Sequence, residues 1–287
     1  MKLERGINLG GYLSQCEHSK THYETFLHDE DMNKIAEMGF DHVRLAIDYE
    51  VLETEDGETK EDGFTYVTRV VNWCRKYELN VVLDLHKAYG YDFNDAGNQE
   101  KNNLFHNEAT QKRFVDLWIK LATHYGEEKH VAFELLNEVV EKENAEAWNQ
   151  LIRRTVAAIR AITKDTIIIY GGIQWNSVKT LKLLDKPRDK NILFTFHFYE
   201  PLLFTHQKAH WVKTIDQKED IFYPESMEYY KTKSIPIGYQ GEVVRKAHSR
   251  TMGPEFITEM VMEAITAANN AETGLYCGEF GVIDQAP

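Results

Sequence analysis

The feature that most constrains the fold is a run of apolar residues that ends abruptly in polar ones, Val131-Ala-Phe-Glu-Leu-Leu-Asn-Glu138. Such dense hydrophobicity is typical of a strand buried on both faces, as in a parallel sheet covered by helices. A helical pattern follows from about residue 145 to residue 162, so Asn137 and Glu138 lie at a strand-to-helix junction. Barrel enzymes place their reacting groups at such junctions.

The same alternation of apolar strand and amphipathic helix recurs along the chain. Strands are expected near residues 6–12, 41–47, 80–86, 131–138, 165–170, 191–199 and 275–279. Helices are expected near residues 29–38, 63–77, 108–125, 145–162 and 254–268. Seven such units imply right-handed parallel crossovers and predict an α/β fold, a (β/α)₈ TIM barrel truncated after the seventh strand. A doubly wound sheet is the alternative, but Gly6-x-x-x-Gly10-Gly11 is not the GxGxxG loop that such a fold would want.

We expect one catalytic domain over residues 1–287, because no linker, repeat or low-complexity segment divides the chain. After the sixth strand the pattern breaks down from about residue 200 to residue 250. A segment of this length in a compact domain is usually functional, which predicts a lid or subdomain over the site; the alternative is a surface excursion with its own small core. The segment is rich in aromatic and histidine side chains, namely Phe204, His206, His210, Trp211, Phe222, Tyr223, Tyr229 and Tyr230.

Charge and cysteine content argue against several classes of partner. The net charge is −13, and no basic run is present, so nucleic acid is not an expected partner. No stretch has the roughly 18 apolar residues of a membrane span, and the amino terminus lacks the apolar core of a signal peptide. We therefore expect a soluble chain without membrane contact, whose location, secreted or cytoplasmic, stays open. Cys16, Cys74 and Cys277 are an odd set without CxxC spacing, which predicts neither disulfides nor a metal site.

A second glutamate, Glu279, ends the predicted seventh strand, as Glu138 ends the fourth. Strand ends of a barrel meet at one rim, so the two carboxylates can face one another there. A pair of this kind suits glycoside hydrolysis, in which one group protonates the leaving oxygen and the other attacks or activates water. A separation of about 5–5.5 Å would give retention and roughly 6.5–9.5 Å inversion, and the sequence leaves this open.

Other strand ends offer further candidate site residues. Arg44 lies inside the second apolar strand and needs a carboxylate partner, either as a buried ion pair or, the reading we favour, as a brace for a catalytic carboxylate. His86 ends the third strand, and it is either a residue of the active site or a hydrogen-bonded histidine of the core. His197 and Tyr199 are two residues apart and therefore point to the same side of the sixth strand. Trp175 follows the fifth strand and is either a sugar platform or a hydrophobic plug.

Taken together, these motifs resemble glycoside hydrolase family 5, most closely its clostridial endoglucanase-type members. The likeness runs from Gly6 to Val282. It rests on Phe133-Glu-Leu-Leu-Asn-Glu138, Arg44, Asp84-Leu-His86, His197-Phe-Tyr199 and Gly278-Glu279-Phe-Gly281, together with Ile7-Asn-Leu-Gly-Gly and Phe204-Thr-His-Gln-Lys-Ala-His-Trp211.

The resemblance implies a retaining mechanism with Glu138 as acid/base and Glu279 as nucleophile. It implies that Asn137 binds the sugar 2-hydroxyl, that Arg44 keeps the nucleophile oriented and ionised, and that Tyr199 hydrogen-bonds to it. It also implies that His86, His197 and Tyr199 line the cleaving subsite. Trp175 and Trp211 are further candidates for substrate binding. No metal or cofactor is implied, and the expected substrates are β-1,4-linked glucans, with mannans, xylans and mixed-linkage glucans in some branches.

Two departures from the family pattern bear on activity. Ala46 stands where the family usually has proline, which we expect to be tolerated. The family's eighth strand and its sugar-stacking tryptophan have no counterpart, so the first and seventh strands should carry open edges. We expect either a truncated gene with weakened activity or self-association that covers the gap.

The predicted function is an endo-β-1,4-glucanase. The alternatives are a β-mannanase or glucomannanase of the same family, and an inactive barrel that only binds β-glucan. A metal hydrolase ranks well behind these.

Overall fold

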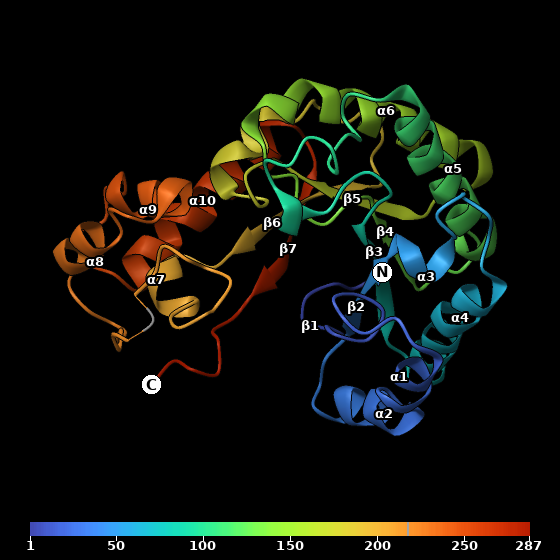
Figure 1. Cartoon of the computed structure of the whole chain (residues 1–287), viewed down its shortest axis with the longest axis horizontal. Helices are drawn as coiled ribbons and strands as arrows, with labels where there is room; N and C mark the ends of the chain where they lie inside the picture. The colour runs from blue at the N-terminus through green and yellow to red at the C-terminus, as the bar shows by residue number, and fades with distance from the viewer. Residues whose placement is uncertain (217) are drawn as a thin grey trace.

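The computed structural model describes residues 1–216 and 218–287, and over these residues it forms a barrel-like sheet of parallel strands (Figure 1). The strands are β1 Gly6–Asn8, β2 His42–Asp48, β3 Asn80–Lys87, β4 Val131–Glu134, β5 Ile167–Gly171, β6 Ile192–Phe198 and β7 Gly274–Phe280. Each strand pairs with its successor, in the order β1-β2-β3-β4-β5-β6-β7. This confirms the TIM-barrel prediction with seven strands in the described residues.

Amphipathic helices cover the outside of the sheet. The long ones are α2 Asp29–Glu37, α4 Glu61–Lys76, α5 Glu108–Tyr125, α6 Ala145–Ile162 and α10 Pro254–Asn270. The shorter ones in the barrel are α1 Lys20–Thr25, α3 Tyr49–Leu52, η1 Phe93–Asp95, η2 Lys142–Asn144 and η3 Val178–Leu183. Helices α4, α5 and α6 line one side of the barrel (Figure 1), and α5 begins where the Asn107 side chain accepts the main-chain N–H groups of Ala109 and Thr110. Between β5 and β6 the crossover holds only η3 instead of a long helix.

The prediction that the fourth strand runs to Glu138 was wrong by four residues, because β4 ends at Glu134. The carbonyl groups beyond it are bound by side chains instead of by a neighbouring strand. Trp118 Nε1 donates to the Leu135 oxygen at 3.0 Å, and Asn176 Nδ2 donates to the Asn137 oxygen at 2.5 Å. Residues 135–138 therefore form a fixed loop rather than a strand.

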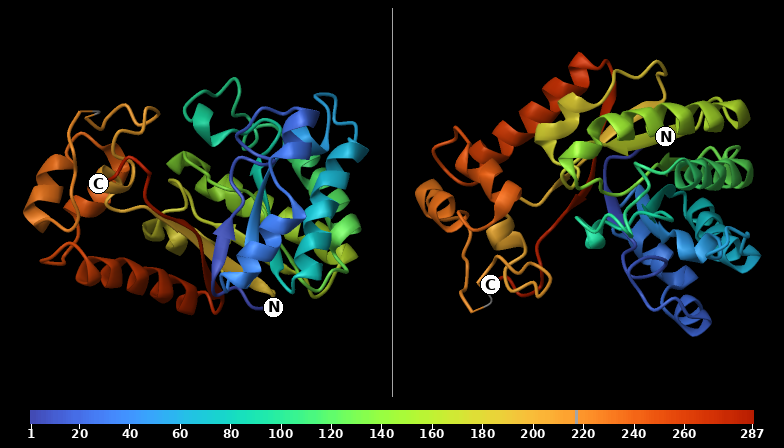
Figure 2. Two further views of the ribbon diagram at one scale, coloured as in Figure 1. Left: turned by 90° about the horizontal axis from the view of Figure 1, so that it is seen from below. Right: turned by 45° about the horizontal axis from the view of Figure 1, so that its top comes forward.

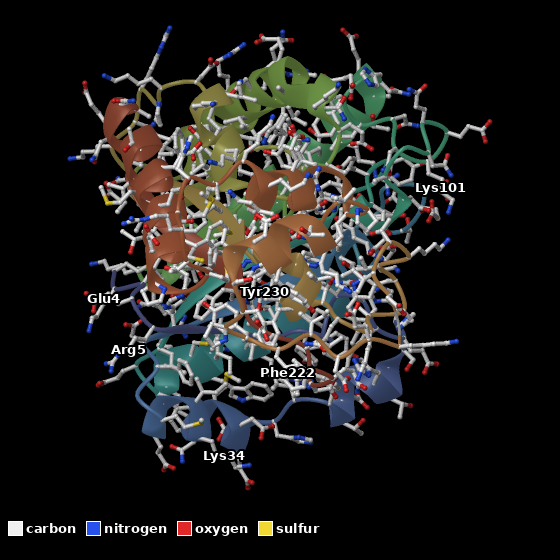
Figure 3. The ribbon with its side chains drawn as sticks, turned by 90° about the vertical axis from the view of Figure 1, so that its left-hand side faces the viewer. Glu4, Arg5, Lys34, Lys101, Phe222 and Tyr230 are labelled. Carbon is white, nitrogen blue, oxygen red and sulfur yellow. The ribbon has the colours of Figure 1, made fainter. Side chains whose placement is uncertain are left out.

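Residues 200–216 and 218–253 form a lobe beside the barrel, drawn in orange in Figure 1 and seen from another side in Figure 2. It contains α7 Leu202–Thr205, α8 Met227–Lys233 and α9 Gly238–Arg245, and α10 leads from it back to β7. Figure 3 views this face, where the buried Tyr230 donates its hydroxyl to the Phe222 carbonyl at 2.5 Å. Buried residues of the lobe belong to the same hydrophobic cluster as those of the barrel, so the lobe packs on the barrel through a continuous core.

The two outer strands, β1 and β7, each have a strand partner on one side within the described residues. Side chains of β1 and β2 reach across to β7: Asn8 Nδ2 of β1 donates to the Gly278 carbonyl at 3.0 Å, and His42 Nε2 of β2 lies 3.0 Å from the Tyr276 hydroxyl. A cavity of about 400 Å³ remains between these strands. The barrel is thus nearly closed, with two free strand edges.

A search of the described helices finds none with both the length and the apolar character needed to cross a membrane.

Candidate active site

A cleft of about 1490 Å³ opens at the carboxyl ends of the strands, between the barrel rim and the lobe. It brings together all nine side chains that the sequence singled out. These are Arg44, His86, Asn137, Glu138, Trp175, His197, Tyr199, Trp211 and Glu279.

The two predicted glutamates face each other across His197. The imidazole Nδ1 lies 2.7 Å from Glu138 Oε1 and 3.5 Å from Glu279 Oε2. One oxygen of each carboxyl group and a ring nitrogen of His197 all lie within 4.8 Å of one another. Burial lowers the pKa of His197, but the charge of Glu279 and the bond to Glu138 outweigh it, so the net pKa is raised.

Glu279 is held as a carboxylate by donors and cations. Arg44 Nη1 donates to its Oε1 at 2.7 Å, and the Tyr199 hydroxyl donates to its Oε2 at 2.9 Å. Burial opposes ionisation, yet the charges of His197, Arg44 and His86 and the Tyr199 hydrogen bond together lower the pKa of Glu279 to about 2. Glu279 is therefore ionised throughout the ordinary pH range.

Arg44 is 1% exposed and binds groups from several strands. Its Nε and Nη2 donate to Glu134 at 2.7 and 3.0 Å, a bidentate pair. Nη2 also donates to Asn137 Oδ1 at 2.9 Å and lies 3.0 Å from Asp84 Oδ2, and Nη1 donates to Asn8 Oδ1 at 3.0 Å. Arg44 therefore makes a buried ion pair with Glu134 and also contacts the carboxylate of Glu279, so the geometry agrees with either interpretation.

His86 lies on the neighbouring wall of the cleft. Its Nδ1 is 2.7 Å from Asp84 Oδ2, and its Nε2 is 3.2 Å from the Gln15 amide nitrogen. Phe93 meets the imidazole ring edge-on, with centroids 5.2 Å apart. These contacts fix the ring, which is 6% exposed.

The two predicted sugar-binding tryptophans line the cleft in different ways. Trp175 is partly buried and lies in a left-handed run, residues 174–176, with φ values of 52°, 58° and 51°. Its main-chain N–H donates to the Val139 carbonyl at 3.2 Å. Trp211 belongs to the lobe and is 59% exposed, in edge contact with His206 and His210.

Two groups of described side chains have the spacing of cation ligands. One is Glu138, His197 and Glu279, in which His197 Nδ1 is hydrogen-bonded to Glu138 Oε1. The other is His18, Asp48 and Glu50, where Lys87 Nζ lies 3.7 Å from Asp48.

Three acidic residues at the site escaped the sequence analysis as candidates. Glu134 and Asp84 look like interruptions in apolar strands, and only the need of the buried Arg44 for partners could have pointed to them. Glu200 also lines the cleft, two residues after the end of β6, and no sequence signal separated it from the start of the insertion.

Residues 7–287 match the sequence profile described as Cellulase (glycosyl hydrolase family 5). The chain belongs to glycoside hydrolase family 5. This confirms the family that the motifs predicted.

Several family 5 relatives match over almost the whole chain. Endoglucanase C of Acetivibrio thermocellus is 42% identical over 298 residues, which cover 99% of this chain and 82% of the relative. Cellodextrinase A of Ruminococcus flavefaciens is 39% identical, and the match covers 98% of this chain and 76% of the relative. Among solved structures, Thermotoga maritima Cel5A in complex with cellobiose is 25% identical, with a TM-score of 0.66. The match covers 99% of this chain and 93% of the Cel5A chain.

Proposed function

We propose that this protein is a retaining endo-β-1,4-glucanase that cleaves internal bonds of cellulose-type or mixed-linkage glucans. The observation that carries the proposal is the placement of Glu138 and Glu279, with carboxylate oxygens within 4.8 Å of one another at the floor of the cleft. Such a short separation fits double displacement, because inversion needs room for a water between the carboxyl groups. The similarity to Endoglucanase C supports the glucan substrate.

In this mechanism the Glu279 carboxylate attacks the anomeric carbon while Glu138 gives its proton to the glycosidic oxygen, and the carbon–oxygen bond breaks. Water then attacks the same carbon, loses its proton to Glu138 and releases Glu279. Arg44 and Tyr199 orient the attacking oxygens, and Asn137, held by Arg44, is placed to bind the 2-hydroxyl.

The direct test is reducing-sugar release from soluble β-glucan, carboxymethylcellulose, glucomannan and xylan, followed by NMR of the first product anomer. We expect release from the glucans, with the β-anomer formed first and no loss of activity in EDTA. Formation of the α-anomer first would contradict the double displacement. Preferential release of reducing sugar from glucomannan would change the assignment from a glucanase to a mannanase or glucomannanase.

We expect Tyr199→Phe to lower kcat by about tenfold and to move the acid limb of kcat/KM toward higher pH. The hydroxyl donates to ionised Glu279, so its loss raises the pKa of Glu279, and the nucleophile becomes protonated sooner as the pH falls. The measurement is kcat/KM from about pH 3 to pH 8. Tyr229→Phe, on α8 and outside the cleft lining, is the matched control; superimposable profiles for all three proteins would contradict the role of Tyr199.

We also propose self-association through the free edges of β1 and β7. An unpaired strand edge is a template for pairing with another chain, and the exposed Val282 follows the β7 edge. Sedimentation velocity over a range of protein concentrations should show dimers that Val282→Lys weakens. Met262→Lys, a similar change on the exposed face of α10, should have no such effect. A monomer at every concentration would refute the proposal.

A further inference from the structure

Glu200 is a cleft-lining carboxyl group that the double displacement does not use. It lies two residues after the end of β6, next to Tyr199, and is partly buried. The main-chain N–H of Tyr199 donates to its Oε2 at 3.2 Å. Among residues 1–216 and 218–287 no side chain is hydrogen-bonded or ion-paired to it, so the carboxyl group keeps bonding capacity toward the cleft.

The lobe and the barrel both contribute groups around Glu200. Burial raises the pKa of Tyr239 of α9, which is near enough for the charge of Glu200 to raise this pKa as well, and Tyr239 donates its hydroxyl to Ser177 Oγ at 3.3 Å; Tyr239 and Ser177 both line the cleft. Lys179 of η3 attracts Glu200, but its ammonium is ion-paired with Glu263 of α10.

The charge state of Glu200 is set by burial. Burial raises its pKa to about 7, against the two main-chain N–H groups and the charge of Lys179, which favour the ionised form. Cys277 of β7 and Tyr239 are the other titratable groups that sense it. Both the acid and the carboxylate are therefore populated near neutral pH, and the acid can donate as well as accept a hydrogen bond.

We propose that Glu200, together with Tyr239, forms a glucose-binding position in the cleft beyond the reacting pair, where the carboxyl group binds sugar hydroxyls of a long glucan chain. An acid that donates and accepts matches neighbouring hydroxyl groups, and Tyr239 adds an aromatic surface with a polar tip. The main-chain N–H of Tyr199 holds Glu200 while the Tyr199 hydroxyl holds Glu279, so this position is one residue from the nucleophile's support. The inference rests on the proposed glucanase function.

The test compares a long and a short substrate, cellopentaose and an aryl β-cellobioside. We expect Glu200→Ala to lower the ratio of their kcat/KM values by about tenfold, the usual loss for a hydrogen bond of this strength. Glu228→Gln, an exposed carboxyl group of α8 outside the cleft lining, removes the same charge and should leave the ratio as in the wild type. If Glu200 served only to support the fold, both substrates would suffer equally, and an unchanged ratio would overturn the proposal.

The pH dependence gives a second readout. A bound sugar removes water from Glu200 and so favours its neutral form, which means that long chains bind the protonated form more tightly. The wild-type ratio should therefore fall more steeply as the pH rises through about 7 than the ratio for Glu200→Gln, whose side chain cannot titrate. All other titrating groups are common to the two proteins, so the difference between their slopes isolates Glu200. The same slope in Glu200→Gln as in the wild type would overturn the role of Glu200.

If the proposed glucanase function itself were wrong, the wild type would hydrolyse neither substrate. Calorimetric binding of cellopentaose to the wild type and to Glu200→Ala would still test the position: about tenfold weaker binding in the variant supports it, and equal binding refutes it.

Discussion

Replacement of Glu279 by alanine is expected to lower kcat on β-glucan by about 10⁴-fold or more, the scale of loss when a catalytic nucleophile is removed. The carboxylate is fixed by Arg44 Nη1 at 2.7 Å and by the Tyr199 hydroxyl at 2.9 Å, and no other described acidic side chain is hydrogen-bonded to both of these residues. The measurement is steady-state reducing-sugar release, with folding checked by circular dichroism. Activity within tenfold of the wild type would remove Glu279 from the mechanism.

Azide makes this test specific. In Glu279→Ala the small anion can occupy the vacated space and attack the anomeric carbon, while Glu138 still protonates the leaving oxygen, so activity on an aryl β-cellobioside should return and the product should be an α-glycosyl azide. Glu138→Ala is the matched control. It should keep the first step with a good leaving group, which needs no proton, and azide should then yield the β-glycosyl azide. The same azide anomer from both variants would contradict the assignment of roles.

Replacement of Arg44 by methionine is expected to remove activity and also to lower the free energy of unfolding by about 3–5 kcal/mol. The change leaves Glu134 and Asp84, both 0% exposed, without their cation, and an uncompensated buried charge is costly. Burial raises the pKa of Glu134, and protonation of this carboxyl group relieves the cost, so the loss of stability should be smaller at pH 5 than at pH 8, where the group would otherwise ionise. Urea unfolding at the two pH values measures this.

Two further variants separate the charge of Arg44 from its shape. Arg44→Lys keeps the charge but cannot make the bidentate bond to Glu134 while also reaching Glu279, so it should restore much of the stability and little of the activity. Glu134→Gln keeps Arg44 but weakens its anchor, and it should lower kcat more than it raises KM, because Glu134 acts through Arg44 on the nucleophile. Full activity in Arg44→Lys would show that only the charge matters.

Much of this architecture follows from sequence periodicity. Helix α6 begins and ends where the 3.6-residue pattern places it, and α5 likewise, because their apolar faces and caps are local features. Glu138 and Glu279 could be predicted as a facing pair because the register of parallel strands brings strand ends to one rim. The end of β4 could not be predicted, since it depends on Trp118 and Asn176 side chains that come from distant parts of the chain.

The roles of buried charges are the part that sequence leaves undetermined. Glu134 and Glu138 are four residues apart on one segment, yet one anchors Arg44 and the other faces His197, and only three-dimensional pairing tells them apart. Glu200 is a similar case, because its surroundings come from η3, α9 and β7, which are remote from it in sequence.

The guanidinium of Arg44 crosses the interior and touches β1 through Asn8, β3 through Asp84, β4 through Glu134 and β7 through Glu279. Arg44 thus connects four strands of the barrel. We expect a displacement of any one of these strands to shift the carboxylate of Glu279, so activity should depend on the integrity of the whole barrel. In directed evolution, stabilising substitutions far from the cleft should therefore increase activity at elevated temperature. Arg44 and its partners, by contrast, should not tolerate substitution one at a time.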